Sequence, residues 1–383
     1  MARPSPWRRP AQRFPLFPHL AVVPALLAIA TAVSLFAHSD VNAALLWSQC
    51  HARALLPALS RVPVLGTPSC FLVGFLYAAL DSLRSRAVMG VILAFVGALL
   101  TVSTVESARK VNARSPVVSR PTLPWLVFNL GGGALVWQLV IVPAFIQAAQ
   151  AWPPARREGG DDDDDDEAVP DGHGRESEAD AGRHVSRADV VAIPVAVALG
   201  YYVPSALMLG LPSPVAIGSW LFSPAYVSLI RRFVRHSLRQ WPRFRPARAI
   251  HLEAHARALA AVYALPVLGS LLAHGFLIGN LAAGADDRRE MTVSAMALIV
   301  IEFQYIGLTL LYWVFVEVGW RAPLAIALLS VLLGPGAGTA VGWVYREKLI
   351  ASHLVAQPLA SAGDVDDQER GPGQADEQTP LLQ

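Results

Sequence analysis

Long apolar windows alternate with short charged stretches along most of the chain. A helix of about 20 apolar residues is long enough to cross the hydrocarbon core of a bilayer. Backbone N–H and C=O groups need partners within the segment there, so such windows become helices. We therefore predict an all-α fold, a polytopic transmembrane bundle of about eight or nine helices. The windows cover residues 17–37, 62–80, 87–105, 123–149, 190–211, 215–230, 259–283, 291–317 and 322–345.

Two polar segments divide this pattern into four parts. Residues 1–152 hold the first four predicted helices, and residues 189–350 hold helices five to nine. The segment 153–188 contains a run of aspartates and few apolar residues, which predicts a disordered acidic loop. The segment 351–383 is predicted to be a disordered polar tail. The first apolar window is too long for a cleavable signal peptide, so we expect it to serve as a signal anchor.

Composition agrees with a membrane location. Hydrophobic residues make up 54% of the chain and charged residues 16%, whereas soluble domains carry roughly a quarter charged residues. We therefore predict a multi-pass integral membrane protein of the endomembrane system, in the endoplasmic reticulum or vacuole. Two cysteines cannot form a disulfide framework, and Cys50 and Cys70 are predicted to be free thiols.

Arginine and lysine in the loops predict the orientation, because cytoplasmic loops are enriched in them. The basic head and the segment 231–257 are both predicted to be cytoplasmic, although the basic loop 106–120 falls on the opposite side. Nine helices would also place the tail opposite, yet residues 377–382 match an acidic dileucine signal that is read in the cytoplasm. Either one window is not a full span, or the dileucine match is accidental. Residues 334–336, Gly-Pro-Gly, make the ninth window the candidate for a broken or re-entrant segment.

Glu302 is the strongest candidate for chemistry, because it is the only acid deep within an apolar window. An intramembrane acid costs at least ~2.5 kcal/mol on insertion scales and normally faces the protein interior. A carboxylic acid that stays protonated near neutral pH can donate a proton. At about 100° per residue, one helix face also carries Tyr305, Thr309 and Trp313, with Glu317 at its edge. The alternative interpretation is an interhelical hydrogen bond from Glu302, with the aromatic rings filling packing space.

The fourth window holds a second polar cluster. It contains Asn129, three glycines at 131–133, Trp137 and Gln138. Glycines let another helix or a ligand approach the backbone closely, and helix packing alone would explain them. Asn129 and Trp137 are kept as candidate substrate-binding residues together with Tyr305, Thr309, Trp313 and Glu317. The intramembrane His274 is expected to be structural.

Neither a metal, a cofactor nor nucleic acid is expected. No His or Cys pair has metal-ligand spacing, so we predict no metal site. The run 161–166 and the motif 364–367 resemble acidic motifs of soluble terpene enzymes, but both lie in segments that cannot form a buried pocket. The basic segment 231–257 is expected to contact anionic lipid headgroups rather than nucleic acid, since it adjoins membrane helices.

Several strings of residues resemble a known group of fungal proteins. They are 123–133 (LPWLVFNLGGG), 137–145 with its Trp-Gln and Pro-Ala-Phe, 198–205 (ALGYYVPS) and 219–224 (SWLFSP). The likeness is to the membrane-bound terpene cyclases of the ascochlorin, ascofuranone and macrophorin pathways. It covers most of the membrane part, but neither the acidic loop nor the tail.

The resemblance implies a cyclase that protonates an epoxide or alkene on a lipophilic prenylated substrate and guides a carbocation, without redox change or metal. Glu302 as the proton donor rests on the residue argument, and Asp81, Glu106 and Glu317 are the competing acids. The alternatives are a small-molecule transporter or efflux protein, in which Glu302 would relay protons, and a non-catalytic membrane scaffold.

Overall fold

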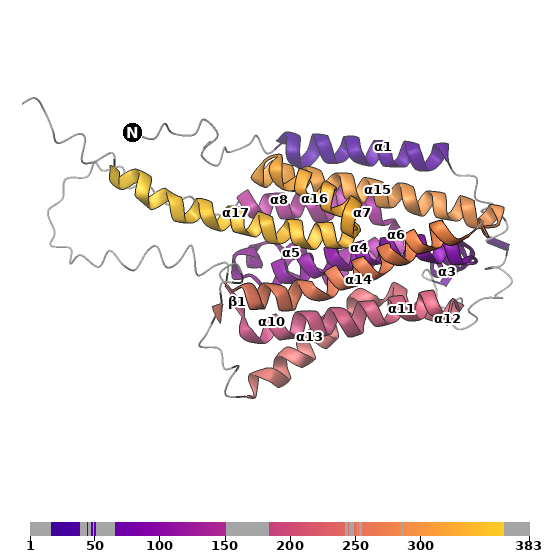
Figure 1. The fold of residues 1–383 in the computed structure, drawn as a ribbon, viewed down its shortest axis with the longest axis horizontal. Coiled ribbons are helices and arrows are strands. Elements are labelled where there is room, and N and C mark those ends of the chain that lie inside the picture. The colour runs from indigo at the N-terminus through magenta and orange to yellow at the C-terminus, as the bar shows by residue number, and fades with distance from the viewer. Residues whose placement is uncertain are drawn as a thin grey trace, which may run out of the picture.

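The described part of the chain is a bundle of helices that run along a common axis (Figure 1). A computed structural model describes residues 17–38, 66–150, 184–241, 255–284 and 286–363, with positions 44, 47, 48, 50, 244, 249, 250 and 252. The predicted acidic loop lies outside the described residues up to position 183, as does the tail from 364. The one strand pairing described is short: β1 (Val185–Ser186) runs antiparallel to β2 (Ala249–Ile250). The predicted all-α class is confirmed.

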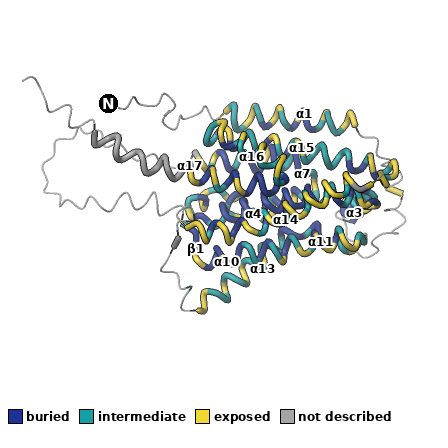
Figure 2. The backbone as a smooth tube through the Cα atoms, viewed as in Figure 1, coloured by how far each residue is buried: buried dark blue, intermediate teal, exposed yellow. Residues whose placement is uncertain are grey.

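Five helical runs in the described part are long and apolar enough to cross a membrane. The most buried is α4, whose residues 91–106 are all buried, so it forms the centre of the bundle (Figure 2). The helix α1, which follows the π-turn η1, is by contrast mostly exposed. The five runs are η1–α1 (Pro18–Val22, Val23–Ala37), α4 (Leu83–Ala108), α10–η5–α11 (Arg187–Val197, Ala198–Tyr202, Val203–Gly210), α14 (Ala256–Ala283) and α15 (Glu290–Val318).

The other predicted windows form shorter or broken helices. The second is α3 (Gly66–Ala79), and the sixth is α12 (Pro214–Leu221), which continues after one residue as the basic helix α13 (Ser223–Arg239). Short turns η3 (Lys110–Arg114) and α5 (Pro116–Ser119) follow α4. The fourth and ninth windows each reverse direction within the bundle.

The fourth window is a helical hairpin rather than one long helix. The helix α6 (Thr122–Gly131) ends at Gly132, whose φ is +103°, and the returning limb is α7 (Gly133–Val136), η4 (Trp137–Ile141) and α8 (Val142–Gln150). The rings of Trp125 and Trp137 lie 6.0 Å apart, although twelve residues of straight helix would span about 18 Å. The backbone therefore turns back at Gly132, where a positive φ favours glycine.

The ninth window is a second hairpin, which confirms the break predicted around residues 334–336. The helix α16 (Arg321–Leu333) stops at Gly334, with φ +88°, and α17 (Pro335–Gly363) returns beside it. A Cβ on Gly338 would overlap Ser330, and one on Gly342 would overlap Ile326. Glycines four residues apart thus let the two limbs approach closely. The helix α17 extends 13 residues beyond the predicted end of the membrane part at residue 350.

We predict that Gly342→Ala destabilises the protein by about 1–3 kcal/mol, because the added methyl group overpacks the contact with Ile326. Gly275→Ala on α14 is the matched control, since a Cβ there meets nothing within 4 Å. Its higher helix propensity should leave stability unchanged or raise it by up to about 1 kcal/mol. Denaturant unfolding in detergent measures both values, and equal effects would contradict the close packing of the hairpin.

The two ends of the bundle differ in charge. Both hairpins begin and end where α4 and α15 finish, and the chain enters α1 at this same end (Figure 1). We call it the basic end. Its basic residues are Arg109, Lys110, Arg114, Arg120, Arg187, Arg231, Arg232, Arg235, Arg239, Arg257, Arg321, Arg346 and Lys348.

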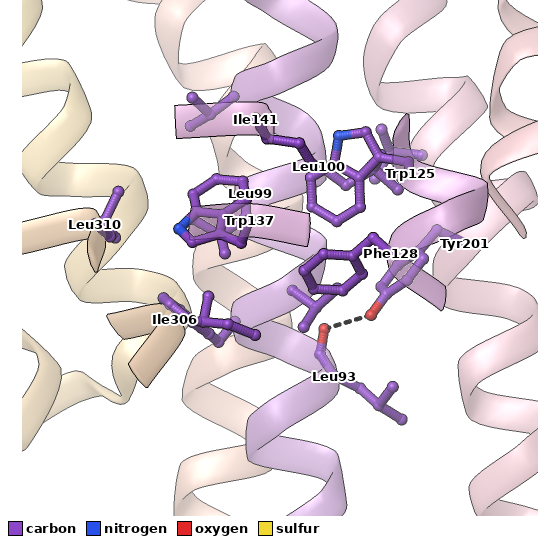
Figure 3. Packing of buried hydrophobic residues seen from close by; sticks show 14 of the residues in the cluster. Leu93, Leu99, Leu100, Trp125, Phe128, Trp137, Ile141, Tyr201, Ile306 and Leu310 are labelled. Atoms are coloured by element: carbon purple, nitrogen blue, oxygen red, sulfur yellow. Dashed lines mark hydrogen bonds between the residues drawn. The ribbon is translucent and has the colours of Figure 1, made fainter. Parts of the chain in front are cut away.

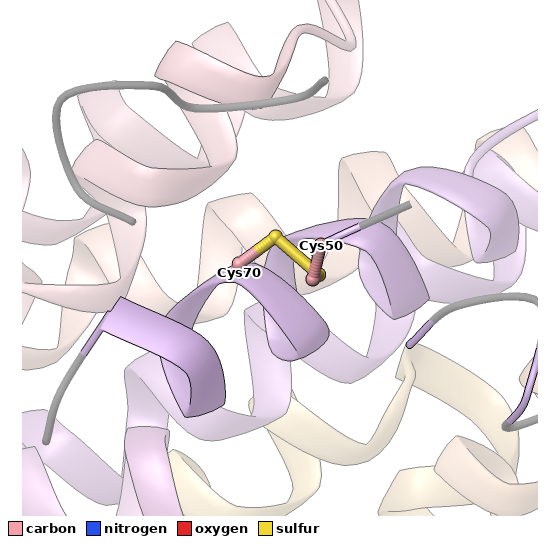
Figure 4. The surroundings of a disulfide bond; sticks show 2 residues. All are labelled: Cys50 and Cys70. Carbon is pink, nitrogen blue, oxygen red and sulfur yellow. A yellow bond between two sulfur atoms is a disulfide. The ribbon is translucent and has the colours of Figure 1, made fainter. Parts of the chain in front are cut away.

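The opposite end of the bundle carries a disulfide between Cys50 and Cys70, where we had predicted free thiols (Figure 4). Their Cα atoms lie 5.7 Å apart, within the range that a disulfide spans. The prediction was wrong because position 50 packs against α3, a tertiary contact that the cysteine count does not reveal. Near this end, acids and arginines balance each other: Asp287 accepts hydrogen bonds from the backbone of α4, and Asp286 pairs with Arg288.

Candidate functional site

Glu302 lies near the middle of α15, facing the tip of the first hairpin. A Cβ on Gly132 would come within 3.7 Å of its carboxylate oxygen, so the backbone turn and the acid are neighbours. The next residue, Phe303, packs edge-on against Phe95 in the middle of α4, with ring centroids 5.0 Å apart. Among the described residues, none forms a hydrogen bond or ion pair with the Glu302 carboxyl group, which is partly exposed. The two polar features of the fourth and eighth windows therefore meet at one place.

The hydroxyl groups predicted to accompany Glu302 are already bonded. The Tyr305 hydroxyl shares a hydrogen bond of 2.8 Å with Ser34 on α1, and Thr309 donates to the backbone carbonyl of Tyr305. One turn further along, the Tyr312 hydroxyl contacts the His19 ring at 2.6 Å. The contacts of Tyr305 and Tyr312 attach α15 to α1 and η1, and they hold the face that carries Glu302 in position.

The predicted indoles of Trp137 and Trp313 are fully buried in a stack of aromatic rings. Figure 3 shows Trp137 among buried side chains that include Trp125 and Phe128. Trp313 lies 6.2 Å from Trp137, 4.6 Å from Phe145 and 4.7 Å from Trp343, measured between ring centroids. The stack joins the two hairpins through α15. Aromatic pairs of this geometry each add about 0.5–1.5 kcal/mol beyond their buried area. The two tryptophans therefore contribute to packing between helices.

The amide groups of the fourth window point to different helices. Asn129 donates to the Leu221 carbonyl at 3.1 Å and to the Ser223 hydroxyl at 3.4 Å, bridging the break between α12 and α13. Gln138 instead exchanges hydrogen bonds with Thr31 on α1. Asn129 thus has structural partners at the junction of α12 and α13.

The remaining candidate, Glu317, belongs to a buried cluster of charges that the sequence argument missed. Its carboxylate pairs with Arg346, which also binds Glu347 at 2.6 Å. Arg109 binds Glu347 at 2.8 Å and Glu106 at 3.2 Å. Three carboxylates and two guanidinium groups from α4, α15 and α17 thus form a connected network at the basic end of the bundle.

Neighbouring polar and aromatic side chains complete this charge network. The Trp313 indole donates to Glu317 at 2.7 Å, and Asn112 donates to Glu106 at 2.9 Å. The Arg346 guanidinium lies 4.1 Å from the centre of the Trp343 ring, a cation–π distance. Buried charges are tolerated when they are paired and hydrogen-bonded in this way. The sequence did carry a signal for this network, because acids and arginines lie next to the ends of several apolar windows that meet at the basic end.

Two cavities lie elsewhere in the bundle. One, of about 410 Å³, is mainly apolar and lies between α4, α11 and α14, beside the buried Tyr202 hydroxyl group. The other, of about 160 Å³, is lined by arginines at the basic end. Glu302 lines neither. Within the described residues, no three His, Cys, Asp or Glu side chains are placed to hold a metal ion. No protein-family model, curated protein or solved structure matches this chain.

Proposed function

We propose that this chain is a multi-pass membrane enzyme, a terpene cyclase in which Glu302 protonates an epoxide or alkene of a lipophilic prenylated substrate. The observation that carries the proposal is the Glu302 carboxyl group, which has no described partner and is partly exposed near the middle of α15. An acid used only for packing would be expected to bond to a neighbouring helix. Glu302 is instead open to a ligand that approaches from the bilayer.

The proposed topology has six crossings and two re-entrant hairpins. The crossings are α1, α4, α10–α11, α12–α13, α14 and α15, while the hairpins α6–α8 and α16–α17 enter and leave at the basic end. This arrangement puts most of the described arginines and lysines at one end, including those of the loop 106–120, in agreement with the charge rule for cytoplasmic loops. The disulfide then lies on the opposite, oxidising side of an endomembrane. The start of α1 and the end of α17 would both face the cytoplasm.

This topology predicts that both chain termini are cytoplasmic. Epitope tags at residues 1 and 383 should both be digested when protease is added to sealed microsomes. Maleimide should label Cys50 and Cys70 only after the membrane is opened and the protein is reduced. A protected C-terminal tag beside a digested N-terminal tag would show that one hairpin crosses the membrane.

The proposed reaction needs no oxidant or reductant, because it begins when a proton is donated and ends when a proton is released. The Glu302 carboxylic acid protonates the epoxide oxygen, the C–O bond breaks, and the resulting carbocation is attacked by an alkene of the same chain. The final cation then loses a proton, which restores the acid by way of solvent, so that the product is an isomer of the substrate. Binding of the substrate in a water-poor site protects the cation from capture by water.

The experiment that tests the proposal is an activity assay in microsomes. Membranes containing the protein are supplied with prenylated aromatic epoxides and polyenes, and products are separated by chromatography with mass detection. We expect a cyclised product of unchanged mass that is absent from control membranes. A failure to cyclise any of these substrates would refute the cyclase assignment.

The second candidate function is transport of a small molecule. It is favoured by the two broken hairpins, because helices interrupted inside a membrane often form ion or substrate sites. The tip at Gly334 lies against Ser270 and His274, and the buried Nδ1 of His274 has no hydrogen-bond partner in the described structure. Proton-coupled uptake into liposomes, without cyclised product, would support this function.

A further inference from the structure

Four arginines line the smaller cavity at the basic end of the bundle. The cavity has a volume of about 160 Å³ and lies between the end of α4, the start of α6 and the basic helix α13. We call it the arginine pocket, and its polar lining consists of Thr104, Ser107, Ser119, Arg120, Thr122, Ser228, Arg231, Arg232 and Arg235.

One of these arginines is held in place by protein groups. Arg231 donates through Nε to Asp189 at 3.1 Å and through Nη1 to the Ser107 hydroxyl at 2.6 Å. Arg235 lies 3.9 Å from the same Asp189 carboxylate. Asp189 lies in the first turn of α10 and accepts a hydrogen bond from the Ser186 hydroxyl. The pocket therefore has one carboxylate behind four guanidinium groups, which leaves a strong positive charge.

Arg120 and Arg232 are the two arginines of the pocket without a partner in the part of the chain that the structure describes. Among the described residues, none forms a hydrogen bond or ion pair with Arg120 or Arg232, and both side chains are exposed at the mouth of the pocket. The helix α6 also starts here, at Thr122, without a side-chain cap. Its first backbone N–H groups add to the positive potential, because a helix N-terminus attracts anions.

We propose that the arginine pocket binds the phosphate group of an anionic ligand, a phosphomonoester or a diphosphate. Guanidinium groups match phosphate oxygens in pairs of parallel hydrogen bonds, and the pocket offers two guanidinium groups, those of Arg120 and Arg232, that have no partner among the described residues. Leu229 and Phe233 on α13 are exposed next to the pocket. Such apolar side chains suit the acyl chains of a lipid whose headgroup fills the pocket.

Binding is tested with the full-length protein in phosphatidylcholine nanodiscs. In one arm phosphatidic acid is incorporated into the nanodisc, and in the other arm soluble inorganic diphosphate is titrated. We expect saturable binding of at least one ligand, and the arm that saturates identifies whether the phosphate comes from a lipid or from solution. If the protein bound neither ligand, the proposal would be overturned.

Matched variants distinguish binding in the arginine pocket from non-specific attraction of anions to the basic helix α13. Arg120→Gln with Arg232→Gln should lower the affinity about tenfold or more, because it removes the charged hydrogen-bond donors. Arg239→Gln, on the same helix α13 but outside the pocket, should lower it less than about threefold, as a screened charge does. Equal losses in both proteins would overturn the proposal. Arg120→Gln alone provides the same test if the double variant does not fold, since its exposed side chain has no described partner.

Discussion

Replacing Glu302 with glutamine should lower the rate of cyclisation by about 10²–10⁴-fold, the usual contribution of a general acid. Glutamine keeps the size and a hydrogen-bonding head of the side chain but has no acidic proton. The fold should tolerate the change, because the carboxyl group has no described partner to lose and faces the glycine turn at Gly132. The measurement is the initial rate of product formation in microsomes at equal protein levels.

Two controls show whether the loss belongs to the acid itself. Glu290→Gln, at the exposed first turn of the same helix, removes an identical group and should leave the rate within a factor of about two, as for a surface substitution. Glu302→Asp keeps the proton but withdraws it by one methylene group, and should retain part of the activity. Cyclisation at the full rate by Glu302→Gln would assign the proton to another acid, while keeping the class of reaction.

Replacing Arg346 with methionine should destabilise the protein by about 3–5 kcal/mol, the cost of breaking a buried ion pair from one side. Arg346 pairs with Glu317 and Glu347 and stacks on Trp343. Methionine fills much of the same volume, but it leaves three buried carboxylates facing Arg109 alone. Unfolding in mixed detergent micelles measures the change in free energy.

Lys348→Met is the matched control for Arg346→Met. Lys348 is also basic and lies two residues away on α17, but its side chain is exposed. Its replacement should change stability by no more than about 0.5 kcal/mol. Arg346→Lys should fall between the two, because an ammonium group cannot reproduce the bidentate contact. If Arg346→Met and Lys348→Met had similar effects, the buried network would not be a source of stability.

Residue patterns along the chain predicted where helices form better than they predicted where the chain reverses direction. The apolar windows became α-helices, and the Gly-Pro-Gly at 334–336 marked a true break. The three glycines at 131–133 were noted as a place of close approach, but not as a reversal of the chain. A glycine run permits either straight or reversed backbone, so its local signal cannot decide between them. The choice depends on what α6 and α7 pack against, including the contact between Trp125 and Trp137.

In the candidate site, too, local sequence patterns identified single residues but not the neighbours that pack against them. Glu302 was found from its position in an apolar window, since an intramembrane acid is costly enough to stand out. Trp313 was expected on the same helix face as Glu302, and Trp137 in the fourth window was kept as a substrate-binding candidate, because periodicity places residues on a helix face without saying which neighbour covers that face. The structure packs both indoles into the interior instead. The partners of Glu317 were missed because Arg109, Arg346 and Glu347 come from distant segments.

The sequence by itself determined the all-α class, the apolar character of the helices, the acid within α15 and the break at residue 334, because each follows from composition or spacing along one segment. Only the tertiary structure decided where the chain reverses, whether the two cysteines meet and which charges pair. Those features arise from contacts between segments far apart in the chain, and no local pattern encodes them. The direction of the two hairpins belongs to this second group, and so does the location of most of the described arginines and lysines at one end of the bundle.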